Sequence, residues 1–485
     1  MNKVTVIESL WKKDVEIGLR EPLREDIEAD VAVIGAGLAG ALTAYFLQQK
    51  GLKTVVLEAS RIGSGQTGNT TAKITSQHGL IYGKLIKEFG TEKARQYAMA
   101  NEAAIAAYES LIHKLNISCE FERRASYLYS INNEQALLDE AQAAGELGID
   151  AQYVTDADIP IKAIGAVRFG NQAQFHPLRF LKSVAEGLTI YEQTQVTDIK
   201  DHSLICEQGS VHAKHIVMAT HFPFINTPGY YFMRMHQERS YALALENVPL
   251  PDGMFLGIDA GGLSFRTSGT ALIVGGCSHR TGDANLKDQY ELLRSKVRQL
   301  YPQGKEVAVW SAQDCIPLDG VPYIGRFSAA VADWYVATGF KKWGMTSAMA
   351  AATLLTDAIT GRENPFAEIF SPQRFVLSAS AKQLVEDGTK SVKGLATQFL
   401  SLPSTHTSEL PVGHGGIVEY EGHKMGVYKD ESGQVFVVST RCPHLGCQLE
   451  WNPGERSWDC PCHGSRFDYM GKLIDNPALG GLEHG

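Results

Sequence analysis

The residues from 441 to 465 constrain this chain more than any other stretch. They read RCPHLGC, then a loop bracketed by tryptophans, then CPCHGS. Cys442 and His444 form a C-x-H pair, and after fifteen intervening residues Cys460 and His463 form a C-x-x-H pair. Two thiolates and two imidazoles on paired loops can hold an iron–sulfur cluster or a zinc ion. The pattern predicts two loops that fold onto one another around a metal centre.

Both halves of this stretch resemble the Rieske [2Fe–2S] domain, including the proline after Cys460 and the Gly-Ser after His463. Such a domain binds its cluster with two cysteines and two histidines. The resemblance implies that Cys442, His444, Cys460 and His463 are the ligands. A structural zinc site is the alternative, although zinc does not require the second cysteine pair found in these loops.

That second pair is Cys447 and Cys462. In the Rieske proteins of respiratory complexes this arrangement carries a disulfide between the loops, so the resemblance implies one here. Ser465 keeps a hydroxyl that can bond to the cluster sulfurs, whereas Phe467 stands where high-potential members usually have a tyrosine. Hydrogen bonds to the sulfurs raise the potential, so we expect a value below that of the respiratory proteins.

Length and composition limit what the rest of the chain can be. A chain of 485 residues is expected to form two or three domains, and 44% hydrophobic with 20% charged residues is typical of a globular protein. A net charge of −9 argues against nucleic acid as a partner. Residues 1–26 show no signal peptide, and glycines interrupt the apolar run at 31–47, so we predict a cytoplasmic protein without a transmembrane segment.

A dinucleotide-binding fingerprint lies between residues 31 and 58. A short apolar strand is followed by the turn Gly35-x-Gly37-x-x-Gly40, a helix, and a second strand that ends on Glu58. The glycines permit a tight turn and close approach of a pyrophosphate, the helix N-terminus faces the phosphates, and the acid can bond to ribose hydroxyls. The fingerprint does not by itself distinguish FAD from NAD.

The run LEASRIGSGQTGNTTAK that closes this unit resembles the D-amino-acid oxidase superfamily, which includes glycine oxidase and sarcosine oxidase. The resemblance covers about residues 30–375 and implies FAD as the cofactor. Further segments match in the same order, at residues 174–181, 195–199, 213–220, 315–326 and 337–361. The resemblance implies FAD contacts at Gly35, Gly37, Gly40, Glu58, Gly65, Val196, Gly339, Gly344, Met345 and Thr346.

No catalytic residue is identified. Residues 222–312 alternate apolar and polar side chains, which predicts strands of a second sheet over the flavin. Arg266 and Tyr241 on these strands are candidates for substrate contact, because an arginine can hold a carboxylate through two hydrogen bonds. Ordinary sheet packing or a surface position is the alternative for both.

The predicted fold is an α/β FAD-binding domain of the glutathione-reductase Rossmann type with an α+β substrate domain, plus a C-terminal all-β Rieske domain. Residues 1–29 form a lead-in and residues 30–378 form the oxidoreductase. A linker helix and loop occupy 379–408, and the Rieske domain occupies 409–485.

The combination predicts a flavin-dependent oxidoreductase that acts on the CH–NH group of an amine or amino acid. Electrons then pass from FAD to the [2Fe–2S] cluster and on to an unidentified acceptor. The alternatives are a dehydrogenase for another substrate, a reductase that runs the opposite way, and a redox-responsive electron carrier without an amine substrate. A Rieske oxygenase is disfavoured, because the chain lacks the D-x-x-H-x-x-x-x-H run of such enzymes.

Overall fold

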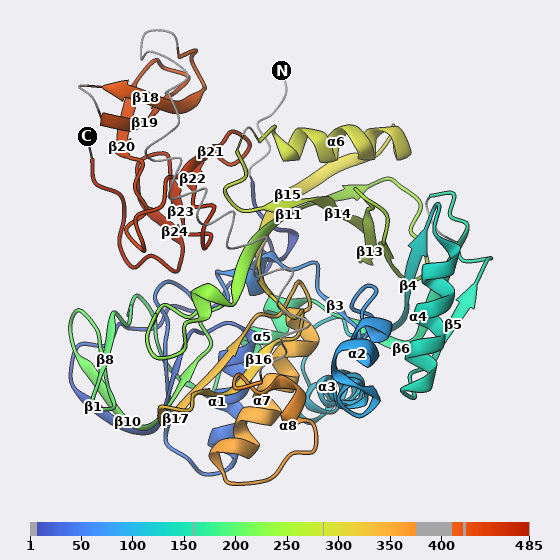
Figure 1. The fold of residues 1–485 in the computed structure, drawn as a ribbon, viewed down its shortest axis with the longest axis horizontal. Coiled ribbons are helices and arrows are strands. Elements are labelled where there is room, and N and C mark those ends of the chain that lie inside the picture. The colour runs from blue at the N-terminus through green and yellow to red at the C-terminus, as the bar shows by residue number, and fades with distance from the viewer. Residues whose placement is uncertain (1–6, 159–160, 285, 375–409, 421–422, 485) are drawn as a thin grey trace.

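The computed structural model describes residues 7–158, 161–284, 286–374, 410–420 and 423–484. An α/β layer and a second, larger sheet form the main body, and a small all-β unit (orange to red in Figure 1) lies beside it. These three parts confirm the predicted fold class. The predicted linker helix at 380–401 lies outside the described residues, so the limits of the linker stay a prediction.

The first sheet has eight strands, and the strands on its main path run in the order β16-β17-β10-β1-β2-β7. All neighbours from β17 to β7 are parallel, whereas β16 is antiparallel to β17. The inner strands are continuous apolar runs, as expected for parallel strands covered on both faces. The strands are β1 (Ile27–Ile34), β2 (Thr54–Leu57), β7 (Thr189–Tyr191), β8 (Asp198–Lys200), β9 (Ser203–Ile205), β10 (Ser210–Met218), β16 (Tyr323–Ser328) and β17 (Val331–Thr338).

Helices cover this sheet and extend the core. α1 packs against α7 and α5, and α3 packs against α7, α2 and α8. The helix-like stretch 80–115 forms two helices, because Gly90 adopts a φ of 83° between them. The helices are α1 (Leu38–Gln49), α2 (Tyr82–Phe89), α3 (Thr91–Leu115), α4 (Glu134–Glu146), α5 (Pro177–Ala185), α6 (Gln289–Leu300), α7 (Gly344–Ile359) and α8 (Ala367–Phe370), with short 3-10 turns η1 (Leu10–Lys12), η2 (Gln66–Asn69) and η3 (Tyr231–Met233).

The second sheet has nine strands, with the order β15-β11-β14-β13-β12-β4-β6-β3 on its main path. It confirms the strands predicted between residues 222 and 312. Its members are β3 (Lys73–Ile74), β4 (Glu122–Ser130), β5 (Ala151–Val154), β6 (Gly165–Gln174), β11 (Met235–Glu246), β12 (Met254–Gly257), β13 (Ser264–Ser268), β14 (Ala271–Arg280) and β15 (Lys305–Pro317).

The C-terminal unit consists of two small antiparallel sheets. Their shared core contains the buried side chains of Val438, Leu449, Trp458 and Phe467. The first sheet has β18 (Gly415–Tyr420), β19 (His423–Lys429) and β20 (Val435–Ser439), and the second has β21 (Glu450–Asn452), β22 (Ser457–Asp459), β23 (Arg466–Asp468) and β24 (Leu473–Asp475).

The lead-in is part of the folded body. Trp11 is completely buried and donates from its indole N–H to the carbonyl of Thr70 at 2.6 Å. The described part of this polar segment thus packs through apolar side chains that include Trp11 and Leu23.

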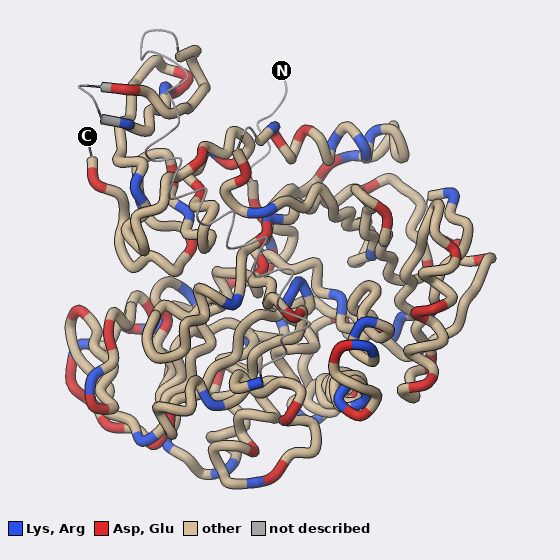
Figure 2. Tube along the Cα trace, viewed as in Figure 1, with Lys and Arg blue, Asp and Glu red and all other residues tan. Residues whose placement is uncertain are grey.

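Charged groups are dispersed over the molecule. Figure 2 shows Lys and Arg interspersed with Asp and Glu along the described chain. None of the described helices is both long enough and apolar enough to cross a membrane.

Candidate functional site

The glycine turn between β1 and α1 leaves no room for side chains. Gly35 has a φ of 104° and donates from its N–H to the carbonyl of Leu57 at 2.8 Å. A Cβ on Gly40 would lie 1.9 Å from the carbonyl oxygen of Gly35. Helix α1 therefore begins in contact with the backbone of β1, and its N-terminus faces the end of the strand.

Glu58 follows β2 directly. Its carboxylate accepts hydrogen bonds from the N–H groups of Ala36 and Ser60, both at 2.8 Å. Burial raises the pKa of this carboxyl, and the two backbone donors oppose that rise. Each oxygen keeps a second acceptor position, as a ribose diol requires.

A cavity of about 540 Å³ opens next to this turn, between the two large sheets. The chemistry of its lining fits a dinucleotide, because it combines the glycine turn, the acid after β2 and the N-terminus of α7. Eight of the ten residues expected to contact FAD line it, namely Gly35, Gly37, Glu58, Gly65, Val196, Gly339, Gly344 and Met345.

The other two residues expected to contact FAD, Gly40 and Thr346, do not line the cavity. Gly40 serves the packing of α1 on β1. The hydroxyl of Thr346 lies 3.1 Å from the carbonyl of Thr75 and 3.1 Å from Nε2 of His78. Its contribution is to hold the first turn of α7 in the core.

The second sheet contributes two charged groups to the cavity that sequence reasoning missed. Lys73 on β3 is buried and donates to the hydroxyl of Ser264 at 2.9 Å. Burial, reinforced by Arg266, lowers the pKa of Lys73 to about 7. Asp314 on β15 also lines the cavity, and burial raises its pKa to about 6. No local motif marks either residue, because each reaches the cavity only through strand pairing.

The structure corrects one of the two substrate candidates. Arg266 is 2% exposed and does not line the cavity. Its guanidinium donates to the carbonyls of Thr71 and Ala72 at 3.0 and 2.8 Å and lies over the ring of Trp11. With those donors bound to the backbone, Arg266 is a packing residue and not a carboxylate clamp.

The other candidate has a different partner. Tyr241 on β11 lines the cavity, but its hydroxyl donates at 2.8 Å to the carboxylate of Glu455, which belongs to the C-terminal unit. The same hydroxyl lies 3.1 Å from Nε2 of His279. The hydroxyl is thus part of a contact between domains.

The predicted metal ligands come from two adjacent loops. Cys442 and His444 lie between β20 and β21, and Cys460 and His463 lie between β22 and β23. Both cysteines are free and buried, and the two imidazole rings lie 4.9 Å apart and perpendicular. The structure therefore brings the four residues together.

The chemistry of these four groups fits metal ligation. Burial lowers the pKa of His444 to about 4 and that of His463 to about 3, so both imidazoles are neutral at neutral pH. Nδ1 of each ring is buried without a hydrogen-bond partner among the described residues. The pKa of Cys442 is lowered, first by the Cys460 side chain and further by backbone N–H groups and the hydroxyl of Ser465.

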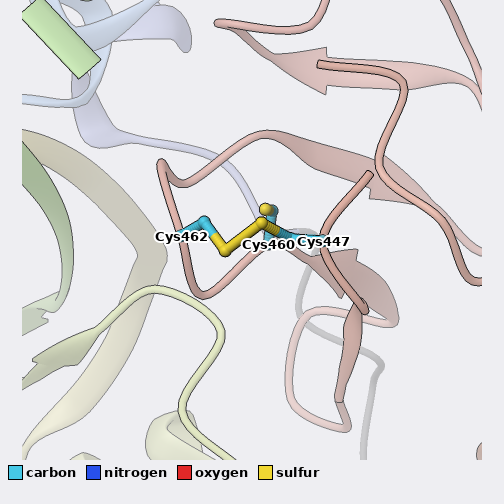
Figure 3. A group of neighbouring side chains, drawn as sticks. All are labelled: Cys447, Cys460 and Cys462. Atoms are coloured by element: carbon cyan, nitrogen blue, oxygen red, sulfur yellow. A yellow bond between two sulfur atoms is a disulfide. The ribbon is translucent and has the colours of Figure 1, made fainter. Parts of the chain in front are cut away.

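A disulfide joins Cys447 to Cys462, as the resemblance implied. Figure 3 shows this bond in yellow, with Cys460 beside it. The three sulfur atoms lie within 4.8 Å of one another. They do not form a ligand set, because two of them are bonded to each other; their closeness places the disulfide against the metal loops.

The cluster loops contact the wall of the cavity. Gln313 on β15 donates to the carbonyl of Gly464 at 2.8 Å, and Gln237 on β11 donates to that of His463 at 2.7 Å. The segment after β23 reaches further, and Asp475 and its neighbours line the cavity itself.

A buried ion-pair network holds the same interface. Glu455, in the turn between β21 and β22, accepts from Arg239 of β11 at 3.0 Å and from Arg466 of β23 at 2.8 Å. All three side chains are at least nine-tenths buried. The C-terminal unit is thus seated on β11 and β15 by charge pairing as well as by backbone contacts.

Two family models match the chain. The model described as "FAD dependent oxidoreductase" matches residues 30–358, and the model described as "Rieske [2Fe-2S] domain" matches residues 401–484. The first covers well over half of the chain.

Curated relatives match either nearly the whole chain or about seven-tenths of it. YhfW of Bacillus subtilis (strain 168), which carries the name of a Rieske 2Fe-2S iron-sulfur protein, is 37% identical over 97% of this chain and 96% of its own. Gamma-glutamylputrescine oxidoreductase of Escherichia coli (strain K12) is 22% identical over 71% of this chain and 87% of its own.

Solved structures share the fold of the large body. Glycine oxidase from Geobacillus kaustophilus aligns with a TM-score of 0.61 and 20% identity, over 72% of this chain and 99% of its own. L-proline dehydrogenase from P. horikoshii aligns with a TM-score of 0.60 and 18% identity, over 73% of this chain and 98% of its own. The two family matches confirm FAD and a [2Fe–2S] cluster as the cofactors. The chain therefore belongs to the FAD dependent oxidoreductase family that includes D-amino-acid oxidase, and it carries a Rieske [2Fe–2S] domain at its C-terminal end.

Proposed function

We propose that this protein oxidises the C–N bond of a small amine or amino acid and delivers the electrons through its cluster to an external acceptor. FAD supplies the two-electron oxidation, and the cluster passes electrons one at a time. One observation carries the proposal. Gln313 lies between two residues that line the cavity, Ala312 and Asp314, while its side chain bonds to the cluster loop at Gly464. A single strand therefore separates the two sites.

The proposed FAD contacts are the residues that line the cavity around the glycine turn and α7. Glu58 would accept hydrogen bonds from the ribose, and the N-termini of α1 and α7 would offer backbone N–H groups to its negatively charged parts. The proposed cluster ligands are Cys442, His444, Cys460 and His463. Two features support this set: the Nδ1 atoms of the histidines have no hydrogen-bond partner among the residues that the structure describes, and the pKa values of the imidazoles are lowered.

The charges of the cavity support a substrate that carries both an amine and a carboxylate. Lys73 can pair with a carboxylate or, as a neutral amine, accept a proton at Nζ from the substrate ammonium, since its pKa is about 7. Asp314 offers the opposite charge. The names of the similar proteins, glycine oxidase, L-proline dehydrogenase and gamma-glutamylputrescine oxidoreductase, point to the same substrate classes.

The test is anaerobic reduction by a panel of amines and amino acids. We expect a substrate to bleach the flavin absorbance, and the electron paramagnetic resonance (EPR) signal of the reduced cluster to follow. The matched control is Cys460→Ser, which should keep flavin bleaching and lose the cluster signal. If no compound of the panel bleaches the flavin, the amine substrate is wrong, and a carrier or reductase function replaces it.

A further inference from the structure

The histidine side of the cluster loops is covered by a segment from the flavin-binding body. This segment, residues 226–233, is part of the connection between β10 and β11 and includes η3. Phe232 lies edge-on to both imidazoles, at 6.2 Å from the ring of His444 and 5.5 Å from that of His463. Residues more than two hundred positions apart in the sequence therefore share one contact.

The polar contact of this segment is specific. Nε2 of His444 lies 2.9 Å from Oδ1 of Asn226, and the carbonyl of Asn226 accepts from the N–H of Tyr230 at 3.0 Å. An amide oxygen only accepts, so Nε2 of His444 carries the proton. Its Nδ1 then has a free lone pair, and this atom is buried without a partner among the described residues.

We propose that Asn226 is a positioning residue for the cluster. It holds His444 in the tautomer and orientation that present Nδ1 to iron, and it polarises the ring by accepting from Nε2–H. A hydrogen bond to the remote N–H makes a histidine a stronger donor to its metal. The oxidised cluster, which carries more positive charge, is stabilised more than the reduced one, so the bond lowers the reduction potential. The inference rests on the proposed ligand set.

This arrangement also ties the potential to domain docking. Asn226 belongs to the flavin-binding body, so the hydrogen bond exists only while the Rieske domain is seated on it. The same seat places the cluster loop against Gln237 and Gln313.

The experiment is a redox titration of the full chain with two variants, followed by EPR. Asn226→Leu keeps the size of the side chain without an acceptor, and Asn226→Asp supplies a charged acceptor. We expect the midpoint potential to rise in Asn226→Leu and to fall in Asn226→Asp. The nitrogen couplings seen by pulsed EPR should change for one of the two histidines only.

Gln195→Leu is the matched control. Gln195 donates to the carbonyl of Leu479 at 3.1 Å, so the control removes a hydrogen bond between the same two domains without touching a histidine. Its potential should equal that of the wild type. A shift of the same sign and size in the control would show that loosened docking, and not the bond to His444, sets the potential, and would overturn the inference.

The remaining outcomes are equally decisive. Unchanged potentials in both Asn226 variants, with full iron content, overturn the inference alone. A wild-type protein that holds no iron overturns the proposed ligand set, and the inference with it. If Asn226→Leu does not fold, the direction of the shift in Asn226→Asp decides.

Discussion

Individual residues at the two cofactor sites are constrained by different forces. Around the glycine turn the constraint is steric, because the backbone of α1 approaches that of β1 more closely than any side chain allows. In the cluster loops the constraint is the burial of polar atoms. Burial keeps the imidazoles neutral, and within the described part of the chain their Nδ1 atoms have no hydrogen-bond partner. The first kind of constraint is tested by adding atoms and the second by changing hydrogen bonds.

Gly40→Ala tests the steric constraint. The new Cβ would lie 1.9 Å from the carbonyl oxygen of Gly35, so α1 must move away from the turn. We expect FAD affinity to fall about tenfold or more, since each 1.4 kcal/mol is tenfold in binding. Flavin absorbance per chain after purification and FAD titration of the apoprotein measure it. Gly145→Ala in α4, where a Cβ meets no atom within 4 Å, should keep full occupancy.

Phe467→Tyr tests the hydrogen bonding of the cluster. Phe467 is completely buried in the core of the Rieske domain and has no hydroxyl to offer to a sulfur. A tyrosine there should raise the midpoint potential, because hydrogen bonds to the sulfurs favour the reduced state. Phe436→Tyr on β20 is the control. Equal potentials in the wild type, Phe467→Tyr and Phe436→Tyr would show that the side chain at position 467 does not influence the potential.

At the scale of elements, strands β11 and β15 contribute both to the cavity and to the interface with the Rieske domain. Some of their residues line the cavity, and Gln237, Arg239 and Gln313 bond to the Rieske domain. The turn between β21 and β22 completes the contact through Glu455. Arg239 and Arg466 hold the pKa of Glu455 at about 2 against the opposing effect of burial. The charged form of Glu455 is therefore part of the folded state.

The free energy of unfolding therefore depends on pH. Between pH 4.5 and about 2 the unfolded chain binds a proton at this position and the folded one does not, so stability rises with pH across that window and is lost as pH falls through it. Glu455→Gln should cost about 1–3 kcal/mol at neutral pH, because it removes the carboxylate that two buried arginines share and leaves them only Asp459 and Asp475 as acidic partners. Thermal unfolding from pH 2 to 7 should show a smaller pH dependence in the variant.

The control for that measurement is Glu291→Gln. Glu291 pairs with Arg294 and Arg298 on the exposed face of α6, where an ion pair contributes about 0–1 kcal/mol. If Glu455→Gln proved as stable as this control, the network would not hold the domains together.

At the scale of the whole molecule, the function depends on how the Rieske domain is docked against β11 and β15. Gly464 has a φ of 79°, and a Cβ there would lie 2.6 Å from Cβ of Gln237. The backbone of the cluster loop thus packs directly against the side chain of Gln237 on β11. This close contact between the cluster loop and β11 shortens the distance over which electrons must pass from the flavin cavity to the cluster.

Gly464→Ala should push the loop away from β11 and slow the reduction of the cluster after the flavin. Anaerobic stopped-flow spectroscopy with substrate measures the two phases separately. Gly433→Ala is matched in backbone strain, with a φ of 87°, but its Cβ meets no atom within 4 Å. Equal cluster-reduction rates in the two variants would contradict a role for this close contact.

The sequence by itself determined the parts whose residues are near neighbours in the chain. Gly35 to Glu58 lie in one strand–turn–helix–strand unit, and Cys442 to His463 lie in one pair of loops. Their spacing therefore predicted a dinucleotide site and a metal centre, and the family resemblances of the same segments implied FAD and a [2Fe–2S] cluster. The sequence could not determine the role of Arg266. The local pattern around an arginine on a strand is the same whether its side chain faces a ligand or, as here, the backbone carbonyls of Thr71 and Ala72.

Tertiary structure decided everything that joins distant segments. Lys73 and Asp314 reach one cavity through the pairing of the second sheet, Gln313 meets Gly464 across 151 residues, and Asn226 meets His444 across 218. No local pattern encodes such contacts, because they follow from which surfaces the folded sheets bury against one another. Cofactor identity is a local property of this chain, and the connection between its cofactors is a property of its packing.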